Sequence, residues 1–290
     1  MAVTLRDAST VLALRERDGA VEVFMVERNS RMGFLGGAHV FPGGAVDAAD
    51  RGPGMAERLS GWDDGAGRSM VGVADPARAR GYLSAAVREL YEEAGILLAR
   101  ADDGRPVEVR DDGDERAQRL AGARDDVASG RLSFSELLGE WGLVLDVREL
   151  RLFGHWITPE REKKRFDTRF FLAPCPPDQH GAADERESTS GDWVTPAGAL
   201  ESYRAREIEL VPPTIATLER LLPFDSVASI LDAADPRTVE PVLPKICIDD
   251  CGVTILYPRD EDYVAGEAGP ADPARSLDRL VLRDGLWERP

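Results

Sequence analysis

The segment around residue 90 constrains this chain most, because its residues fit one secondary structure and give that structure two opposite faces. At about 100° per residue, a helix over 81–95 gathers apolar side chains on one arc and carboxylates on the other. Glu89, Glu92 and Glu93 share the carboxylate side, and Arg88 precedes Glu92 by one turn, a spacing that favours an ion pair. The predicted core face consists of Leu83, Val87, Leu90, Tyr91 and Ala94.

The carboxylate face of this helix predicts a metal site. Three carboxylates within two turns repel one another, and hard divalent cations relieve that repulsion by binding oxygen. The face therefore favours Mg²⁺ or Mn²⁺. The same pattern is typical of a solvated acidic surface, so the helix alone leaves both interpretations open.

The neighbouring sequence favours the metal site. Residues 88–96 (RELYEEAGI) follow a Pro-Gly-Gly turn at 42–44, and the two segments together resemble the signature of the Nudix hydrolase family. Residues 88–96 match its second half at every fixed position. Its first half falls on Gly44, with Asp50 where the family has Glu and with 37 residues, instead of seven, between Asp50 and Arg88. A long inserted loop is compatible with this alignment, because the entropy of loop closure grows slowly with length.

The resemblance implies an α/β fold, the Nudix α/β/α sandwich with a mixed sheet, over about residues 8–200. We therefore expect a Nudix domain at 1–205, with insertions at about 51–80 and 101–150. Residues 206–290 are expected to form a C-terminal helical and β-hairpin extension that packs on it.

The insertion is typical of a long Nudix branch that includes peroxisomal-type coenzyme A diphosphatases. Segments that support this branch are GAHVFPGG at 37–44, HWITP at 155–159 and RFDTRFFLA at 165–173. Arg28 and Gly37 fit the coenzyme A motif, but Gly33 occupies the position of its second arginine, and Arg31 is the nearest substitute.

The resemblance implies metal-dependent hydrolysis of the diphosphate bond in a nucleoside diphosphate linked to another moiety, with coenzyme A or acyl-coenzyme A as candidates. Nucleotide sugars, dinucleoside polyphosphates and NADH remain alternative substrates. A non-catalytic Nudix ligand-binding module is a further alternative, which the complete set of Arg88, Glu89, Glu92 and Glu93 argues against.

The resemblance also assigns roles to residues. The metal ligands would be Glu89, Glu92, Glu93 and the carbonyl of Gly44. The catalytic residues would be Glu93 or Glu187 as general base, together with Glu89 and Arg88. The substrate-binding candidates are Arg28, Arg31, His39, Gly43, Gly44 and Arg165, of which the arginines present donors suited to phosphate.

Composition limits the partners. The net charge of −17 disfavours a nucleic-acid partner, because phosphate backbones bind basic surfaces. The longest apolar stretches are too short for a membrane span, and no basic region with an apolar run opens the sequence, so we expect a cytoplasmic location. Three cysteines (Cys175, Cys247 and Cys251) fit no disulfide framework. The expected partner is a small nucleotide substrate, and a homodimer stays open.

Other segments predict individual elements. Residues 9–14 and 21–26 predict a hairpin, and 151–157 and 166–173 predict further strands. Ser133 and Glu136 predict a capping box that opens a helix, although we expect 101–150 to be an elaboration outside the core. Further predictions are a strand around Trp193, helices over 213–222 and 225–234, and a hairpin over 244–258 followed by a loose polar tail.

Overall fold

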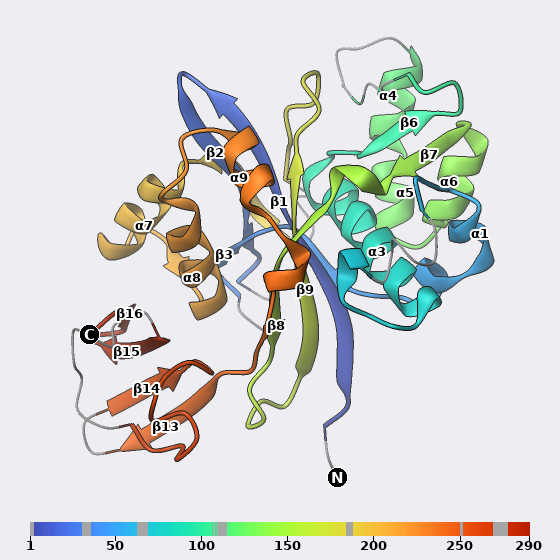
Figure 1. The fold of residues 1–290 in the computed structure, drawn as a ribbon. Coiled ribbons are helices and arrows are strands. Elements are labelled where there is room, and N and C mark those ends of the chain that lie inside the picture. Colours follow the sequence, from blue (N-terminus) through green and yellow to red (C-terminus); the bar gives the residue numbers. More distant parts are fainter. Residues whose placement is uncertain are drawn as a thin grey trace.

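A mixed β-sheet forms the centre of the molecule, with helices on both sides (Figure 1). The computed structural model describes residues 3–30, 36–62, 69–105, 107, 109, 115–183, 188–249, 252–268 and 278–290. The expected α/β class with a mixed sheet is confirmed. In the part of the chain that is described, no helix is long and apolar enough to cross a bilayer.

The sheet opens with the predicted hairpin, β1 (Leu5–Arg17) and β2 (Ala20–Arg28), which pair antiparallel. Asp18 and Gly19 both have positive φ, 52° and 78°, which suits a tight turn between twisted strands. The strand order is β11-β3-β2-β1-β9-β8-β12, with β10 pairing β2 and β4 pairing β1. The other strands are β3 (Ala38–Val40), β4 (Gly43–Ala45), β8 (Arg151–Ile157), β9 (Arg165–Pro174), β10 (Ser188–Val194), β11 (Glu209–Leu210) and β12 (Pro241–Val242).

Helix α3 (Pro76–Ala94) is the predicted glutamate-bearing helix, and it starts five residues earlier than expected. The side chain of Asp75 accepts a hydrogen bond from the Arg78 backbone N–H, and Pro76 occupies the first turn, where it needs no donor. Gly95 ends the helix in the left-handed conformation, with φ 66°. The predicted core face is confirmed, because all five of its apolar side chains are fully buried.

A polar network fixes the first half of α3 to the sheet. The Arg78 guanidinium bridges Asp7 of β1, at 2.7 Å, and Asp167 of β9, at 3.2 Å. The Tyr82 hydroxyl donates to Asp7 at 2.7 Å, and His155 Nε2 lies 2.7 Å from the Asp167 carboxylate. Burial opposes ionisation of Asp7, but hydrogen bonds from Arg78 and Tyr82 outweigh it, so the pKa of Asp7 lies below its ordinary value. Both strands and the helix are therefore held by paired charges.

The insertions contribute to the core, so the prediction that 101–150 is an elaboration outside the core is wrong. Leu120, Leu137, Leu143 and Leu145 are fully or almost fully buried in one cluster with α3. Their spacing was hard to read because charged and glycine-rich residues surround them. The predicted capping box of Ser133 and Glu136 is confirmed. The elements are η1 (Ala49–Arg51), α1 (Pro53–Ala56), β5 (Leu59–Ser60), β6 (Ala99–Ala101), α4 (Glu115–Gly122), α5 (Arg124–Ala128), α6 (Phe134–Glu140), β7 (Leu143–Asp146) and η2 (Val147–Glu149).

The other face of the sheet carries α7 (Pro196–Arg204), α8 (Pro212–Leu221) and α9 (Val227–Ala233), followed by η3 (Pro236–Thr238) (Figure 1). The strand predicted around Trp193 is β10, and the two helices predicted after it are α8 and α9. Strands β11 and β12 show that part of 206–290 joins the main sheet.

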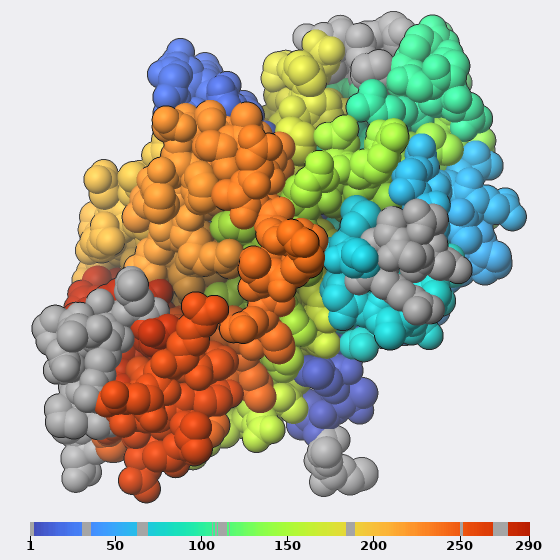
Figure 2. All heavy atoms as spheres, viewed as in Figure 1, coloured from blue at the N-terminus to red at the C-terminus, as the bar shows by residue number. Residues whose placement is uncertain are grey.

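The C-terminal residues form a second sheet of four described antiparallel strands. They are β13 (Lys245–Asp249), β14 (Gly252–Leu256), β15 (Arg279–Arg283) and β16 (Leu286–Glu288). The predicted hairpin is confirmed, but the prediction of a loose tail is wrong. Leu280 is fully buried, and the buried Arg279 donates from Nε to Asp260 at 2.6 Å. In Figure 2 this sheet, in orange-red, lies below the orange helical segment and beside the green-yellow part of the chain.

Candidate active site

Arg88 on α3 organises the acidic residues of the predicted site. Its Nε and Nη2 donate to the two carboxylate oxygens of Asp50 at 3.0 and 2.9 Å, and Nη2 also donates to the Ala45 carbonyl at 3.0 Å. Its Nη1 lies 2.8 Å from Glu89 and 3.2 Å from Glu92. The predicted ion pair between Arg88 and Glu92 is therefore present. Asp50, in η1, is buried, and it contacts Arg88 although the insertion lies between the two residues in sequence.

The glycine turn brings backbone against the carboxylates of α3. The Gly43 N–H donates to Glu93 Oε2 at 2.9 Å. A Cβ on Gly44 would lie 2.4 Å from Glu89 Oε1, and a Cβ on Gly43 would lie 2.4 Å from the Ser9 carbonyl. A side chain at position 43 would therefore clash with backbone, whereas one at position 44 would displace the carboxylate of Glu89.

The site holds more negative than positive charge. Burial raises the pKa of Glu89 to about 7, and the charges of Glu92 and Asp50 act in the same direction against the opposing effect of Arg88. Burial alone would lower the pKa of Arg88, but Glu89, Asp50 and Glu92 raise it above its ordinary value. One permanent cation thus faces several carboxylates.

The donor set suits a hard divalent cation, because Glu89, Glu92 and Glu93 offer carboxylate oxygens and Gly44 offers a carbonyl. Among the described residues, however, no three acidic, histidine or cysteine side chains are gathered closely enough to hold an ion as they stand. The hydrogen bonds explain this arrangement, since Arg88 engages Glu89 and Glu92 while the Gly43 N–H engages Glu93.

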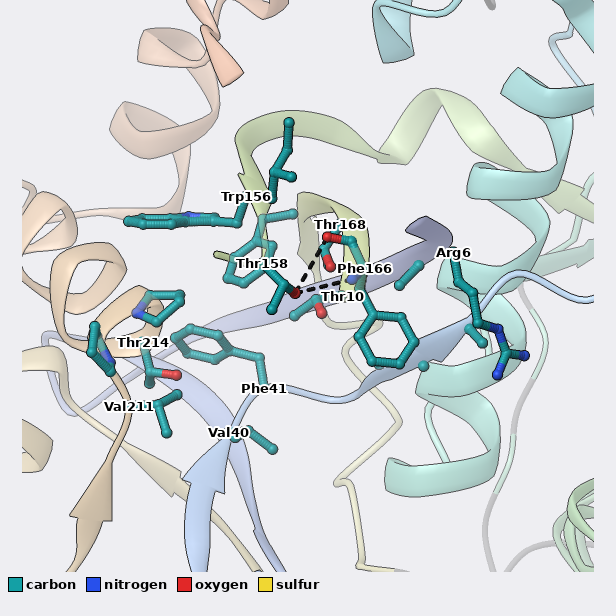
Figure 3. A pocket seen from close by; sticks show the side chains of 18 of the residues that line it. Arg6, Thr10, Val40, Phe41, Trp156, Thr158, Phe166, Thr168, Val211 and Thr214 are labelled. Carbon is teal, nitrogen blue, oxygen red and sulfur yellow. Dashed lines mark hydrogen bonds between the residues drawn. The ribbon is translucent and has the colours of Figure 1, made fainter. Parts of the chain in front are cut away.

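A cavity of about 700 Å³ adjoins these groups. Its polar end is lined by Arg6, Gly43, Gly44, Asp47, Arg88, Glu89, Glu92 and Glu93. Its remaining wall is mostly apolar and comes from β8, β9, the start of α8 and the C-terminal sheet. Figure 3 shows Arg6 on the α3 side, Trp156 and Val211 on the opposite side, and Phe41 and Phe166 between them. Thr158 Oγ1 accepts from the Phe166 N–H at 3.0 Å in the middle of this view.

Strand alternation decides which residues of β9 reach the cavity. Trp156, Phe166, Thr168 and Phe170 line it. Arg165 is absent from the lining, and its Nε donates to the Thr158 carbonyl at 3.1 Å. Arg165 lies on the same face of β9 as Asp167 and Arg169, which form an ion pair on the side away from the cavity. The proposed site therefore does not include Arg165.

The other substrate-binding candidates fall in three places. Arg28 lines the cavity, as do Gly43 and Gly44. His39 lines a different cavity, with Met25 and Asp192, because it alternates in β3 with Val40, which faces the first one. Burial lowers the pKa of His39. We therefore leave His39 out of the proposed site. Arg31 and the alternative general base Glu187 lie outside the described residues.

The sequence reasoning missed Arg6, which lines the polar end of the cavity. Arg6 alternates along β1 with Ala8 and Thr10, and both of these also line the cavity. The pairing of β1 with β4, Ser9 opposite Gly44, sets this register. The alternation of residues 6–10 shows that Arg6, Ala8 and Thr10 share a face, but predicting that this face meets the glycine turn would have required the β1–β4 pairing.

Comparison with known proteins gives a consistent result. Residues 80–221 match the model of the NUDT19 Nudix domain. The acyl-coenzyme A diphosphatase NUDT19 of Gallus gallus is 32% identical, with 92% of this chain and 81% of that protein covered. The protein of the same name from Homo sapiens is 30% identical, with 83% of this chain and 72% of that protein covered. A crystal structure of a Nudix hydrolase from Alicyclobacillus acidocaldarius is 28% identical, has a TM-score of 0.62, and covers 80% of this chain and 98% of its own.

Fold, glutamate helix and glycine turn together define a phosphoanhydride hydrolase of the α/β class. With relatives at this identity and coverage, the chain belongs to the Nudix hydrolase family. Its enzyme class is that of a Nudix-type diphosphatase.

Proposed function

We propose that this enzyme hydrolyses the diphosphate bond of coenzyme A and acyl-coenzyme A. The products would be a bisphosphorylated adenosine and a phosphopantetheine that keeps any acyl group. One observation carries the proposal: a single cavity has the carboxylates of α3 at one end and an apolar wall at the other. That combination suits a substrate that joins a charged diphosphate to a long, less polar arm. The NUDT19 relatives, named acyl-coenzyme A diphosphatases, support the same choice.

We propose Mg²⁺ or Mn²⁺ as the cofactor, held by Glu89, Glu92, Glu93 and the Gly44 carbonyl. When bound, such an ion would neutralise phosphate oxygens and increase the acidity of a coordinated water. Arg88 would hold Glu89 and Glu92 in place through the ion pairs described above. Arg28 and Arg6 would contact the phosphate that is not attacked, since both line the cavity.

The proposed chemical step is in-line attack of water on one phosphorus. The water oxygen forms a bond to phosphorus, the bond to the bridging oxygen breaks, and the bridging oxygen leaves with the electron pair on the other phosphate. Glu93 is our candidate to accept the proton of the water, and the Gly43 N–H orients its carboxylate. Glu187 stays the alternative general base.

A substrate panel tests the proposal. Coenzyme A, an acyl-coenzyme A, a nucleotide sugar, a dinucleoside polyphosphate and NADH would each be incubated with Mg²⁺, with Mn²⁺ and with a chelator. Product masses identify both the substrate and the cleaved bond. We expect cleavage of the two coenzyme A substrates only with metal. Cleavage confined to one of the other substrates would replace this proposal with that alternative, and cleavage of none would favour a non-catalytic ligand-binding module.

We also propose a cytoplasmic location. Cys175 and Cys247 are free thiols, which fits a reducing compartment. Burial raises the pKa of both thiols, Cys175 to about 12, so neither is activated as a nucleophile. A homodimer stays an open alternative for the assembly, and light scattering at several protein concentrations would decide it.

A further inference from the structure

The C-terminal sheet contributes directly to the wall of the active-site cavity. Ile246 of β13, Ile255 of β14 and Trp287 of β16 line it, together with Pro244 just before β13. These residues lie more than 150 positions after the glutamates of α3 in sequence. They share a cavity with those glutamates because the sheet lies against the main domain (Figure 2). A part of the chain outside the Nudix signature therefore shapes the substrate site.

The start of α8 extends this apolar wall. Val211, Pro212 and Pro213 line the cavity. A helix start usually offers free N–H groups to polar ligands, but proline has none and Val211 supplies no side-chain cap. Two successive prolines thus remove donors at the place where α8 meets the cavity. Thr214, the next residue of the helix, also lines the cavity, but the side chains of the three residues before it offer carbon alone.

Three aromatic side chains, Phe41, Phe170 and Trp156, line the cavity between its two ends, and a fourth, Tyr257, packs against Trp156 outside the lining. The ring centroids of Phe41 and Phe170 are 6.4 Å apart, those of Phe170 and Trp156 are 6.5 Å apart, and those of Trp156 and Tyr257 are 5.6 Å apart. These four rings run from the glycine turn to the C-terminal sheet. Such contacts stabilise a fixed shape, so the apolar end is preformed.

The apolar end of the cavity suits one part of the proposed substrate, the acyl chain, better than another, the adenine base. Adenine carries ring nitrogens and an amino group that lose hydrogen bonds when they are buried without partners. A saturated acyl chain carries no such groups, and its burial is favourable at each methylene. A wall of proline, isoleucine and tryptophan side chains therefore suits the acyl chain better than the base.

We propose that the C-terminal sheet and the start of α8 form an acyl-binding arm that makes the enzyme prefer acylated over free coenzyme A. The proposal rests on the proposed function, because the arm can receive an acyl chain only from a substrate whose diphosphate is bound at α3. Catalysis would occur on the Nudix domain, whereas selection of the acyl group would occur on the extension.

The test is a chain-length series, with kcat/KM measured for free coenzyme A and for its acetyl, octanoyl and lauroyl thioesters. The parent enzyme should gain about threefold to fourfold for each methylene that enters the arm, until the arm is full. Ile246→Trp would fill the arm and should lower the ratio of lauroyl- to free coenzyme A by at least about tenfold. Ile248→Trp is the matched control, since Ile248 lies on the same strand, is 67% exposed and is absent from the lining. This control should keep the parent ratio.

A second variant guards against misfolding of the first. Trp287→Ala removes part of the wall and should lower the same ratio, while circular dichroism and thermal unfolding report whether each variant is folded. A parent ratio retained in both folded variants would overturn the acyl-binding arm and leave the diphosphatase function intact. An equal loss of kcat/KM for free and acylated coenzyme A would show that the arm binds another part of the substrate, and this result would also overturn the inference. If the parent cleaved neither, the proposed function itself would fail.

Discussion

The guanidinium of Arg88 makes two hydrogen bonds to the buried carboxylate of Asp50, although 37 residues separate them in sequence. The same guanidinium contacts Glu89 and Glu92. Asp50 therefore holds the arginine that in turn positions the proposed metal ligands. The long insertion between the two residues does not separate them, because η1, which precedes it, packs against α3, which follows it.

The first prediction tests this connection with two neighbouring aspartates. Asp50→Ala should lower the free energy of unfolding by about 3 kcal/mol, because it leaves the buried Arg88 without its bidentate partner. Asp47→Ala is the control. Its carboxylate is 65% exposed and lies 4.0 Å from Arg88, so its removal should cost less than about 1 kcal/mol. Urea unfolding of both variants measures the difference, and equal losses would contradict the role of Asp50.

The second prediction uses the two glycines of the turn. The atoms nearest to an added Cβ at Gly44 belong to the carboxylate of Glu89, whereas those nearest to one at Gly43 include the backbone of Ser9 and Thr10. Gly44→Ala should therefore displace Glu89 and lower turnover by at least ~10-fold, with a stability change below about 1 kcal/mol. Gly43→Ala should destabilise the fold by about 1–3 kcal/mol. Steady-state kinetics and chemical unfolding of both variants measure these effects. Full turnover in Gly44→Ala would refute the role of Gly44 in positioning Glu89.

The third prediction concerns the carboxylates themselves. Glu92→Gln or Glu93→Gln should reduce turnover by at least ~100-fold with little loss of stability, because each removes a proposed metal ligand and also relieves charge repulsion. Glu201→Gln, on the exposed surface of α7, should keep parent turnover. Isothermal titration of Mn²⁺ into each variant would report the ligand role separately. Parent-like titration and turnover in both variants would remove these residues from the metal site.

The fourth prediction follows from the depressed pKa of Asp7. Because its pKa lies below the ordinary 3.8, ionised Asp7 stabilises the fold above that pH, and this contribution is lost as the pH falls through the folded-state value. Asp7→Asn should therefore be less stable than the parent at neutral pH, and the gap should narrow below about pH 4. Asp18, 93% exposed, provides a control, since Asp18→Asn should show no such narrowing. Thermal unfolding across this pH range measures both, and a gap that widened in acid would contradict the network.

The sequence predicted the elements whose signals are local. The register of α3 followed from its helical period, and the β1–β2 hairpin from two apolar runs around Asp18 and Gly19. Strand pairing across long separations could not be derived in this way. The position of Arg6 beside the glycine turn depends on β1 pairing with β4, and that pairing has no local signal.

The C-terminal region shows a second limit of sequence reasoning. Strands β15 and β16 are short, and each buries few side chains, so their alternation resembled a polar tail. They are ordered because β15 pairs with β14, β16 pairs with β15, and the buried Arg279 forms an ion pair with Asp260. The contribution of Trp287 to the substrate cavity could be recognised only from three-dimensional packing.

Hydrolysis in heavy-oxygen water distinguishes attack on the diphosphate from attack on the thioester. The parent enzyme would hydrolyse an acyl-coenzyme A in heavy-oxygen water with Mg²⁺, and mass spectrometry would locate the label. Water attack on the diphosphate predicts heavy oxygen in one product phosphate, an intact thioester, and loss of the reaction in Glu93→Gln. Heavy oxygen in a released fatty acid, with the diphosphate intact, would instead identify a thioesterase and contradict hydrolysis at the diphosphate.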